Sequence, residues 1–286
     1  MLPLESVPNF SEGRDRATID AIGAALDAHA RLLDVHSDRD HNRSVFTLVG
    51  GDDELADALL AGVAVAVERI DLRTHTGAHP RIGATDVVPL VPLRPEDMPR
   101  ARAVAARVGE RIGTELGLPV FVYDPPARGP AYYRRGDLAA RLADRELAPD
   151  YGPPELHATA GGVILGARRP LIAFNVNLRG TVEAAREIAA VVRERGGGFP
   201  GVRALGLDLP SVGCVQVSMN VEDWEASALH DIVERIRAEA AARGAEVVRS
   251  ELVGLMPAGA AAAAAGATLG IDGFDATRLI ELRVID

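Results

Sequence analysis

Apolar residues recur along the chain at two spacings, one typical of strands and one typical of helices. In the first half, short apolar runs predict strands over residues 4–7, 32–36, 44–50, 86–93 and 120–123. Apolar residues at helical spacing predict helices over residues 17–29, 54–70 and 96–116. In the second half, the same spacings predict strands over 171–177, 202–207, 215–220 and 246–253, and helices over 182–195 and 225–243.

Both halves therefore have the order β-α-β-β-α-β, which is the signature of a split-βαβ, ferredoxin-like unit. We predict an α/β (α+β) fold of two ferredoxin-like βαββαβ subdomains with mixed or antiparallel sheets. The joint lies near Arg168–Pro170, so the predicted subdomains are residues 1–170 and 171–286.

The stretch from residue 124 to residue 167 interrupts this pattern with prolines and, at its end, glycines. A loop of this length in a compact domain is usually functional or disordered. Three tyrosines at positions 132, 133 and 151 argue against disorder, so we expect a functional connection. The alanine tract 260–265 predicts a short helix, to which we assign no chemistry.

Composition removes several classes of function. All 31 cations are arginines against 41 Asp and Glu, giving a net charge of −10. A GC-rich genome would explain the arginine bias, but in any case a chain without lysine forms no Schiff base, lysine phosphate loop or biotin carrier. Its single cysteine, Cys214, forms no internal disulfide. The acidic charge disfavours nucleic-acid binding, and no apolar run is long enough to cross a membrane. We expect a cytoplasmic protein.

The densest group of candidate side chains precedes the strand that begins at residue 86. His75 and His79 are four residues apart, but Gly77 and Pro80 disfavour the helix on which such a pair would bind a metal. The pattern is more typical of a histidine that moves a proton beside an arginine, Arg81, that holds a carboxylate. A loop whose histidines only bind backbone carbonyls would look the same.

Two further segments offer chemistry. The run 34–43 combines carboxylates, including Asp38 and Asp40, with histidines and Arg43, although a solvated hairpin connection has the same composition. The segment 151–162 is rich in small residues, which let backbone amides approach a flat ligand closely. It follows no predicted strand and lacks the GxGxxG spacing, so as a motif it is weak.

Several segments resemble glutamate formimidoyltransferases, in the same order: 7–13 (VPNFSEG), 34–45, 75–87, 166–168, 171–178 and 253–257. Together they span nearly the whole chain. The resemblance implies transfer of the formimino group of N-formimidoyl-L-glutamate, from histidine breakdown, to N5 of tetrahydrofolate. It implies tetrahydrofolate as co-substrate, no metal, and a homodimer of chains with N-terminal (1–170) and C-terminal (171–286) subdomains. The vertebrate enzymes add a cyclodeaminase domain, so here we expect the transferase activity alone.

The resemblance also assigns site residues. The family's catalytic histidine, in a His-Pro-Arg step, corresponds to His79. The family's folate-binding segment corresponds to Gly152, Pro153, Pro154, Glu155, Leu156, His157, Ala158, Thr159, Ala160 and Gly161. The chain departs from the vertebrate enzymes twice, with His36 in place of an aspartate and Ala160 in place of an aromatic residue.

The reaction is an amine exchange at an amidine carbon, in which a proton leaves N5 and another reaches the departing nitrogen. We expect His79 to move both in turn, a role typically worth about 10²- to 10⁴-fold in rate. Asp38 or Asp40 would orient it, with His36 and His75 in support. Both substrates are carboxylates, and the candidate arginines to hold them are Arg43, Arg81, Arg168 and Arg169.

Three other functions stay open at this stage. A folate-binding protein without turnover would bind the product but release no glutamate. A related transferase would use another formimino or formyl donor. A metal-dependent hydrolase would hold its metal with His75 and His79. Incubation with formiminoglutamate and tetrahydrofolate separates the expected function from these three.

Overall fold

The computed structural model describes residues 2–123 and 128–285. Its contacts divide the chain into two compact units, Met1–Arg169 and Pro170–Asp286, here called unit 1 and unit 2. Each unit has its own sheet and its own buried apolar cluster.

Unit 1 is built on a mixed sheet of seven strands. They are β1 (Leu4–Ser6), β2 (Asn9–Phe10), β3 (Arg31–Asp38), β4 (Arg43–Gly50), β5 (Thr85–Pro92), β6 (Val120–Tyr123) and β7 (Val163–Ala167). β1 and β2 lie one after the other between β4 and β5, antiparallel to both, and β3 pairs with the other side of β4. β7 lies parallel to β5, and β6 lies parallel to β7.

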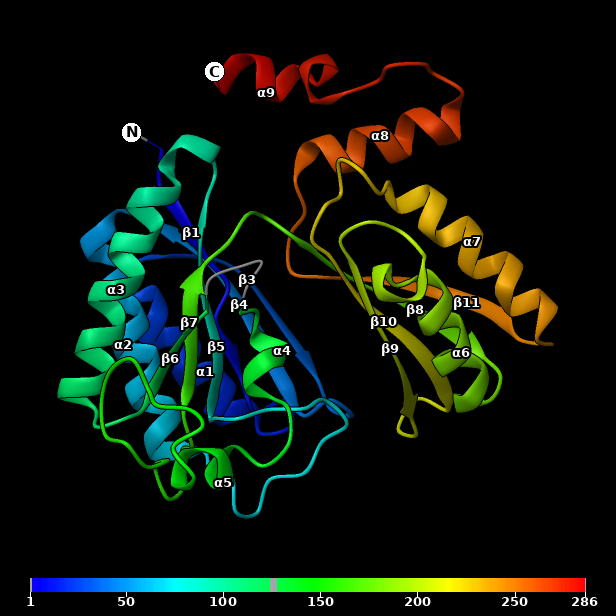
Figure 1. Ribbon diagram of the computed structural model, residues 1–286. Helices are drawn as coiled ribbons and strands as arrows, with labels where there is room; N and C mark the ends of the chain where they lie inside the picture. The colour runs from blue at the N-terminus through cyan, green and yellow to red at the C-terminus, as the bar shows by residue number, and fades with distance from the viewer. Residues whose placement is uncertain (1, 124–127, 286) are drawn as a thin grey trace. The chain divides into compact units, whose positions relative to one another are not determined.

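The longer helices of unit 1 pack on this sheet (Figure 1). They are α1 (Arg16–Asp27), α2 (Asp52–Arg69) and α3 (Met98–Glu115), the last preceded by the short η1 (Pro95–Asp97). α1 and α2 complete a ferredoxin-like βαββαβ unit with the strands up to β5. α3 is the crossover that parallel strands require, and it carries the chain on to β6.

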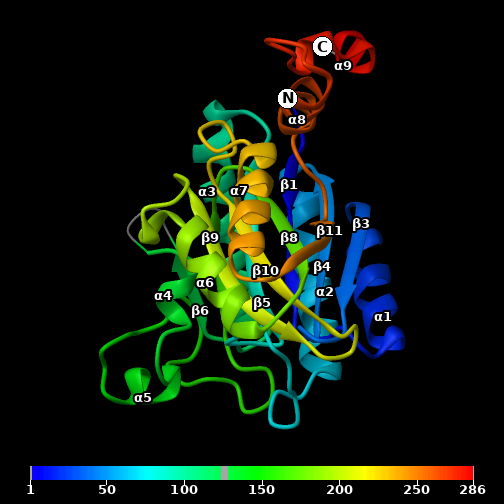
Figure 2. The same ribbon diagram turned by 90° about the vertical axis from the view of Figure 1, so that its right-hand side faces the viewer.

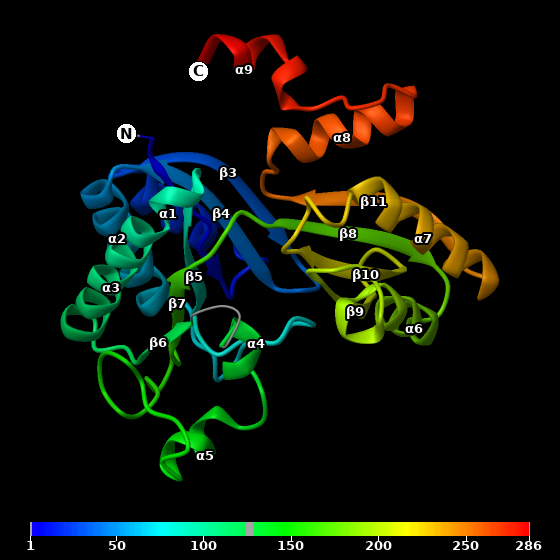
Figure 3. The ribbon, with the colours of Figure 1, turned by 45° about the horizontal axis from the view of Figure 1, so that its top comes forward.

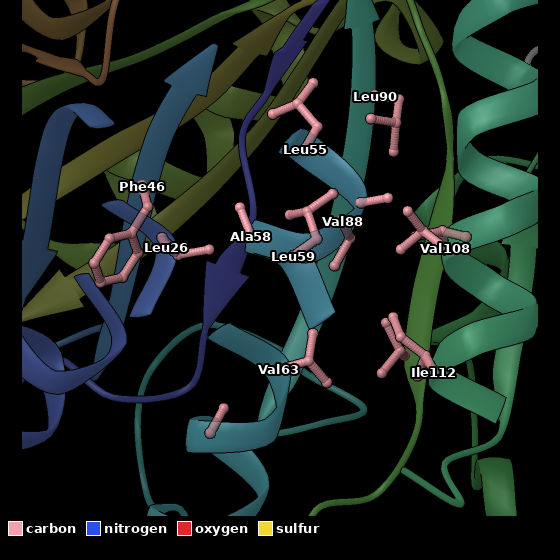
Figure 4. Close-up of a cluster of buried hydrophobic side chains, with 14 of the residues drawn as sticks. Leu26, Phe46, Leu55, Ala58, Leu59, Val63, Val88, Leu90, Val108 and Ile112 are labelled. Carbon is pink, nitrogen blue, oxygen red and sulfur yellow. The ribbon is translucent and has the colours of Figure 1, made fainter. Parts of the chain in front are cut away.

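The packing of α2 and α3 against β5 holds that strand in place (Figure 4). Leu55, Leu59 and Val63 recur at four-residue spacing and therefore share one face of α2. They meet Val88 and Leu90 of β5, and all five side chains are fully buried. Burial of each such side chain contributes about 1.5–3 kcal/mol. The start of β5, and the loop ahead of it, are thus attached to the core.

Unit 2 has an antiparallel sheet with the order β11-β8-β10-β9, the ferredoxin-like arrangement. Its elements are β8 (Ile172–Arg179), α6 (Val182–Val192), η2 (Glu194–Gly196), β9 (Val202–Leu209), β10 (Cys214–Val221), α7 (Leu229–Ala242) and β11 (Glu246–Val253). α6 and α7 pack against one face of this sheet (Figure 3). α8 (Ala258–Leu269), η3 (Ala276–Arg278) and α9 (Ile280–Ile285) follow.

The predicted α/β class with two ferredoxin-like subdomains is confirmed, with two differences in unit 1. The stretch expected to be irregular holds the short helices α4 (Pro130–Tyr133) and α5 (Leu138–Ala143) and a strand, β7; residues 124–127 lie outside the described part. β7 is a five-residue apolar run buried on both faces, so it shows no alternation. β2 is only two residues long, too short for any periodicity.

The alanine tract lies in α8, as expected for its composition. Among the described residues, no helix combines the length and the apolar character needed to cross a membrane.

Candidate active site

A buried carboxylate at the start of β5 organises the candidate site. The side chain of Asp86 is fully buried, and one of its oxygens, Oδ1, accepts a hydrogen bond from the backbone N–H of Ile82 at 2.8 Å. The bond reaches back four residues, so it closes the turn that follows His79. The other oxygen, Oδ2, accepts from Nη1 of Arg43 at 2.7 Å and also contacts Nη2 of Arg134.

Two arginines therefore compensate one acid in the interior of unit 1. Arg43 and Arg134 are only 10% and 15% exposed. Burial disfavours the charged form of Asp86, but Arg134 and Arg43 outweigh it and hold the pKa of this carboxyl well below its usual range. Burial lowers the pKa of Arg43 to about 10, which still leaves it charged at neutral pH. The cluster carries an excess of one positive charge.

His79 lies beside this cluster and is partly buried. Its Nδ1 lies 2.7 Å from the carbonyl oxygen of Pro80, so Nδ1 carries the proton and donates it. Nε2 is then the basic nitrogen of the ring. Burial, followed by the positive charges of Arg43 and Arg134, lowers the pKa of His79 well below its ordinary value, against an opposing effect of Asp86. The imidazole is neutral at pH 7 and can accept a proton.

Arg81 holds the loop of residues 75–83, here called the histidine loop, through backbone atoms. Its Nη2 donates to the carbonyl oxygen of His79 at 2.6 Å and to that of His41 at 3.3 Å, while Nη1 contacts the ring of His75. Burial and the charge of Arg81 lower the pKa of His75. His75 thus contacts Arg81, and the rings of His41 and His79 lie 6.1 Å apart.

Asn42 joins three segments of the loop region. Its Nδ2 donates to the carbonyl oxygen of Thr76 at 2.9 Å, and its Oδ1 accepts from the N–H of Gly13 at 2.9 Å. Its φ of 47° lies in the left-handed region, which asparagine tolerates better than most residues. A Cβ at Gly77 would lie 2.3 Å from the carbonyl oxygen of His41, so only glycine permits this approach.

The predicted supporting residues of the run 34–43 lie on β3 and in the turn after it. Oδ1 of Asp38 accepts from the N–H of His41 at 2.7 Å, so this carboxylate shapes the turn. The backbone oxygen of Asp40 accepts from the N–H of Ala78 at 2.9 Å, which brings this turn to the histidine loop. His36 is partly buried on β3, opposite Val45.

The segment 152–161 is attached to the protein at both ends. Gly152 has a φ of 83°, and a Cβ there would lie 2.1 Å from the carbonyl oxygen of Leu118. At the other end, Ala84 N–H donates to the carbonyl oxygen of Ala160 at 2.8 Å, and Gly162 N–H donates to that of Ile82 at 3.0 Å. The end of this segment therefore lies beside the turn closed by Asp86.

Within that segment, the side chains differ in their exposure and in their hydrogen bonds. Nδ1 of His157 accepts from the N–H of Ala160 at 3.1 Å, so Nε2 carries the proton. The side chain of Ala160 is 1% exposed and packs in the apolar core. Pro154, Glu155 and Ala158 are exposed; Pro153, Leu156 and Thr159 are partly buried.

Arg168 lies at the opposite end of β5 from the histidine loop. Its N–H donates to the carbonyl oxygen of Leu90 at 3.0 Å, and its Nη1 donates to that of Arg169 at 3.0 Å. Burial raises the pKa of Glu5, an effect that the charge of Arg168 opposes. Leu90 is four residues beyond Asp86, roughly 13 Å along a strand. Within unit 1, Arg168 and Arg169 are therefore not brought together with His79.

Sequence reasoning assigned no role to Asp86 or Asn42, although both lie in segments that it singled out, and it did not consider Arg134. A charged residue that begins an otherwise apolar strand was the available signal for Asp86. Arg134 had none, because it comes from the connection after β6 (Figure 2) and meets Asp86 only in the folded chain. Among the described residues, no three His, Cys, Asp or Glu side chains gather as a metal centre requires.

Comparison of the sequence with models of known protein families shows which family the chain belongs to. Residues 3–168 match the model of the N-terminal subdomain of the formiminotransferase domain, and residues 173–269 match that of the formiminotransferase domain. The chain belongs to the formiminotransferase family. The resemblance stated from its motifs is thereby confirmed, and the chain is a transferase.

Named relatives agree with this formiminotransferase assignment. The chain is 41% identical over 283 residues to the glutamate formimidoyltransferase of Streptococcus pyogenes serotype M1, covering 95% of each chain. It is 38% identical over 297 residues to that of Thermoplasma acidophilum, covering 98% of this chain and 97% of the relative. It is 39% identical to the formimidoyltransferase-cyclodeaminase of Rattus norvegicus over 270 residues, which are 89% of this chain and 50% of the rat protein.

Proposed function

We propose that this formiminotransferase moves the formimino group of N-formimidoyl-L-glutamate to N5 of tetrahydrofolate, giving 5-formimidoyltetrahydrofolate and L-glutamate. Full-length similarity to glutamate formimidoyltransferases supports the reaction. The observation that carries the chemistry is a neutral histidine, His79, whose protonated Nδ1 is bound by a carbonyl oxygen. Its basic Nε2 can take a proton and return it.

The proposed mechanism uses that one nitrogen twice. N5 of tetrahydrofolate attacks the carbon of the protonated formimino group, so that a new C–N bond forms, the π electrons of the C=N bond move onto its nitrogen, and Nε2 of His79 accepts the N5 proton. In the tetrahedral intermediate that electron pair re-forms C=N as the bond between carbon and the glutamate nitrogen breaks, and the glutamate nitrogen receives the proton from His79. Glutamate leaves as an amine, so one C–N bond and one proton have been exchanged. A histidine whose pKa is lowered returns the proton readily.

Positive charge around His79 suits anionic substrates. Arg43 and Arg134 outnumber the acid between them, and Arg81 adds a further charge at the loop. In a chain of net charge −10 this is a local excess, which concentrates carboxylates where they react. Arg43 reaches a substrate mainly through this field, since Asp86 and Asn9 accept its hydrogen bonds.

The remaining assignments belong to the same proposal. Gly152–Gly161 forms the folate-binding segment, with tetrahydrofolate as co-substrate and no metal. Asp38 and Asp40 position the turn against the histidine loop, with His36 and His75 in support, and Arg168 and Arg169 hold a carboxylate at the other end of β5. Residues 1–170 and 171–286 act as N- and C-terminal formiminotransferase subdomains in a cytoplasmic homodimer.

The direct test is the reaction itself, with formiminoglutamate and tetrahydrofolate as substrates and formation of 5-formimidoyltetrahydrofolate as the readout. His79→Ala should lower the rate by about 10²-fold or more while equilibrium binding of tetrahydrofolate survives. His29→Ala, at an exposed helix end, is the matched control and should leave both unchanged. Equal loss of turnover and folate binding in His79→Ala would assign His79 a structural role instead.

A further inference from the structure

A cavity of about 230 Å³ lies between the histidine loop and the connection that carries α4 and α5. Its lining residues come from these two segments and from the folate-binding segment: Arg81, Ile82, Tyr133, Arg134, Gly136, Asp137, Leu138, Ala139 and Leu156. The wall combines apolar side chains with two guanidinium groups and the side chain of Asp137. Polar groups placed among apolar side chains are typical of a small-molecule site.

Arg134 is the lining residue whose charged side chain has a hydrogen-bond donor left unpaired by the described part of the chain. Its Nη2 contacts Asp86, while its Nε is buried and, among the described residues, has no hydrogen-bond acceptor. A buried donor of a charged group is unfavourable without an acceptor. Nε itself is closed to a ligand, so a ligand carboxylate would meet the part of the guanidinium that stays exposed, in a side chain that is 15% exposed, and would match its planar shape.

The charges around the cavity favour an anion. Arg43 and Arg134 share the single carboxylate of Asp86, and Arg81 adds a third positive charge. Asp137 also lines the cavity, but its Oδ1 accepts from the N–H of Ala140 as the N-cap of α5. Counting Asp137, the balance is still one positive charge.

Proximity to His79 decides which carboxylate the cavity takes. His79 itself does not line the cavity, but Arg81 and Ile82, two and three residues after it, do. The charges of Arg134 and Asp86 both act on His79, and Arg134 contacts Asp86. In formiminoglutamate, the α-carboxylate is separated from the reacting carbon by only the amide-like nitrogen and the α-carbon. The carboxylates of folate are separated from N5 by a methylene, an amine, a benzoyl ring and an amide.

We propose that this cavity binds the α-carboxylate of the formimino donor and that Arg134 is its anchor. The proposal rests on the proposed transfer reaction and adds a residue that sets donor specificity.

The test compares Arg134→Gln with Arg135→Gln, a neighbouring exposed arginine outside the cavity. Arg134→Gln should raise KM for formiminoglutamate by about tenfold or more and leave KM for tetrahydrofolate unchanged. Arg134→Lys keeps a charge beside Asp86 but loses the planar fork, so it should fold normally and still raise the donor KM. Arg135→Gln should change neither constant. Circular dichroism establishes that each variant is folded.

A donor analogue separates recognition from a structural effect. The formimino derivative of 4-aminobutyrate lacks only the α-carboxylate, so the wild type should discriminate against it. That discrimination should collapse in Arg134→Gln, because the partner of the missing carboxylate is then absent as well. Unchanged discrimination, or an increased KM for tetrahydrofolate in place of the donor, would overturn the assignment.

Calorimetric titration with L-glutamate keeps the two proposals distinct, because it needs no turnover. Glutamate binding that is lost in Arg134→Gln supports the cavity even if the wild type transfers no formimino group, a result that would refute only the proposed reaction. Transfer by Arg134→Gln with the wild-type donor KM would refute only the cavity.

Discussion

At the scale of single residues, the candidate site depends on an aspartate that touches no proposed substrate. Asp86 joins the Ile82 amide, Arg43 and Arg134, so it closes the loop and gathers the charges that act on His79. The aspartate and its arginines lie 43 and 48 positions apart in sequence. No local pattern predicts such a pairing, which is why Arg43 was assigned to a substrate from the sequence and Asp86 was given no role.

Replacing this carboxylate should destabilise the protein strongly. Asp86→Asn leaves two buried guanidinium groups without a counter-charge, and breaking a buried ion pair costs about 3–5 kcal/mol. Urea unfolding gives the change in the free energy of unfolding. Asp53→Asn removes an ion pair with Arg107 in which the acid is 89% exposed, and should cost less than about 1 kcal/mol. Equal changes in the two variants would contradict the role given to Asp86.

The pH dependence of the reaction should report the environment of His79. The base must be neutral, and burial together with Arg43 and Arg134 lowers its pKa below the ordinary value near 6.5. As pH falls, kcat/KM should therefore persist through pH 6.5 and decline only below it. The pH–rate profile of the wild type, with His29→Ala as control, measures this decrease in kcat/KM at acidic pH. A decrease that begins above pH 6.5 would mean that a different group controls the rate.

At the scale of elements, the candidate site lies where β5 begins and the proposed folate-binding segment, residues 152–161, ends. Gly83 and Gly161 face each other there, and the Ile82 carbonyl accepts from the N–H of Gly162. Hydrophobic spacing predicted β5 closely but not β7, because a strand buried on both faces has no alternation to detect. The folate-binding role of residues 152–161 is proposed from the resemblance to the family, and the contact of this segment with residues 82–84 is a tertiary feature.

Gly83 provides a test of the contact between the start of β5 and the end of segment 152–161. A Cβ at Gly83 would lie 1.8 Å from the carbonyl oxygen of Gly162, so Gly83→Ala must separate the two segments. We expect a loss of about 2 kcal/mol or more in stability and weaker tetrahydrofolate binding, measured by urea unfolding and equilibrium titration. Gly129→Ala is the control, because a Cβ there meets none of the described residues within 4 Å. Unchanged folate binding in folded Gly83→Ala would exclude this contact from the folate site.

At the scale of the whole molecule, the sequence by itself determined the class of fold, the two ferredoxin-like patterns and the family. These follow from periodicity and from ordered local motifs, both of which the linear chain carries. Only the tertiary structure decided the pairing of Asp86 with Arg43 and Arg134, the position of Arg168 away from His79, and the cavity beside the histidine loop. Those features depend on contacts between distant segments, which form only when the sheet of unit 1 brings them together and excludes water.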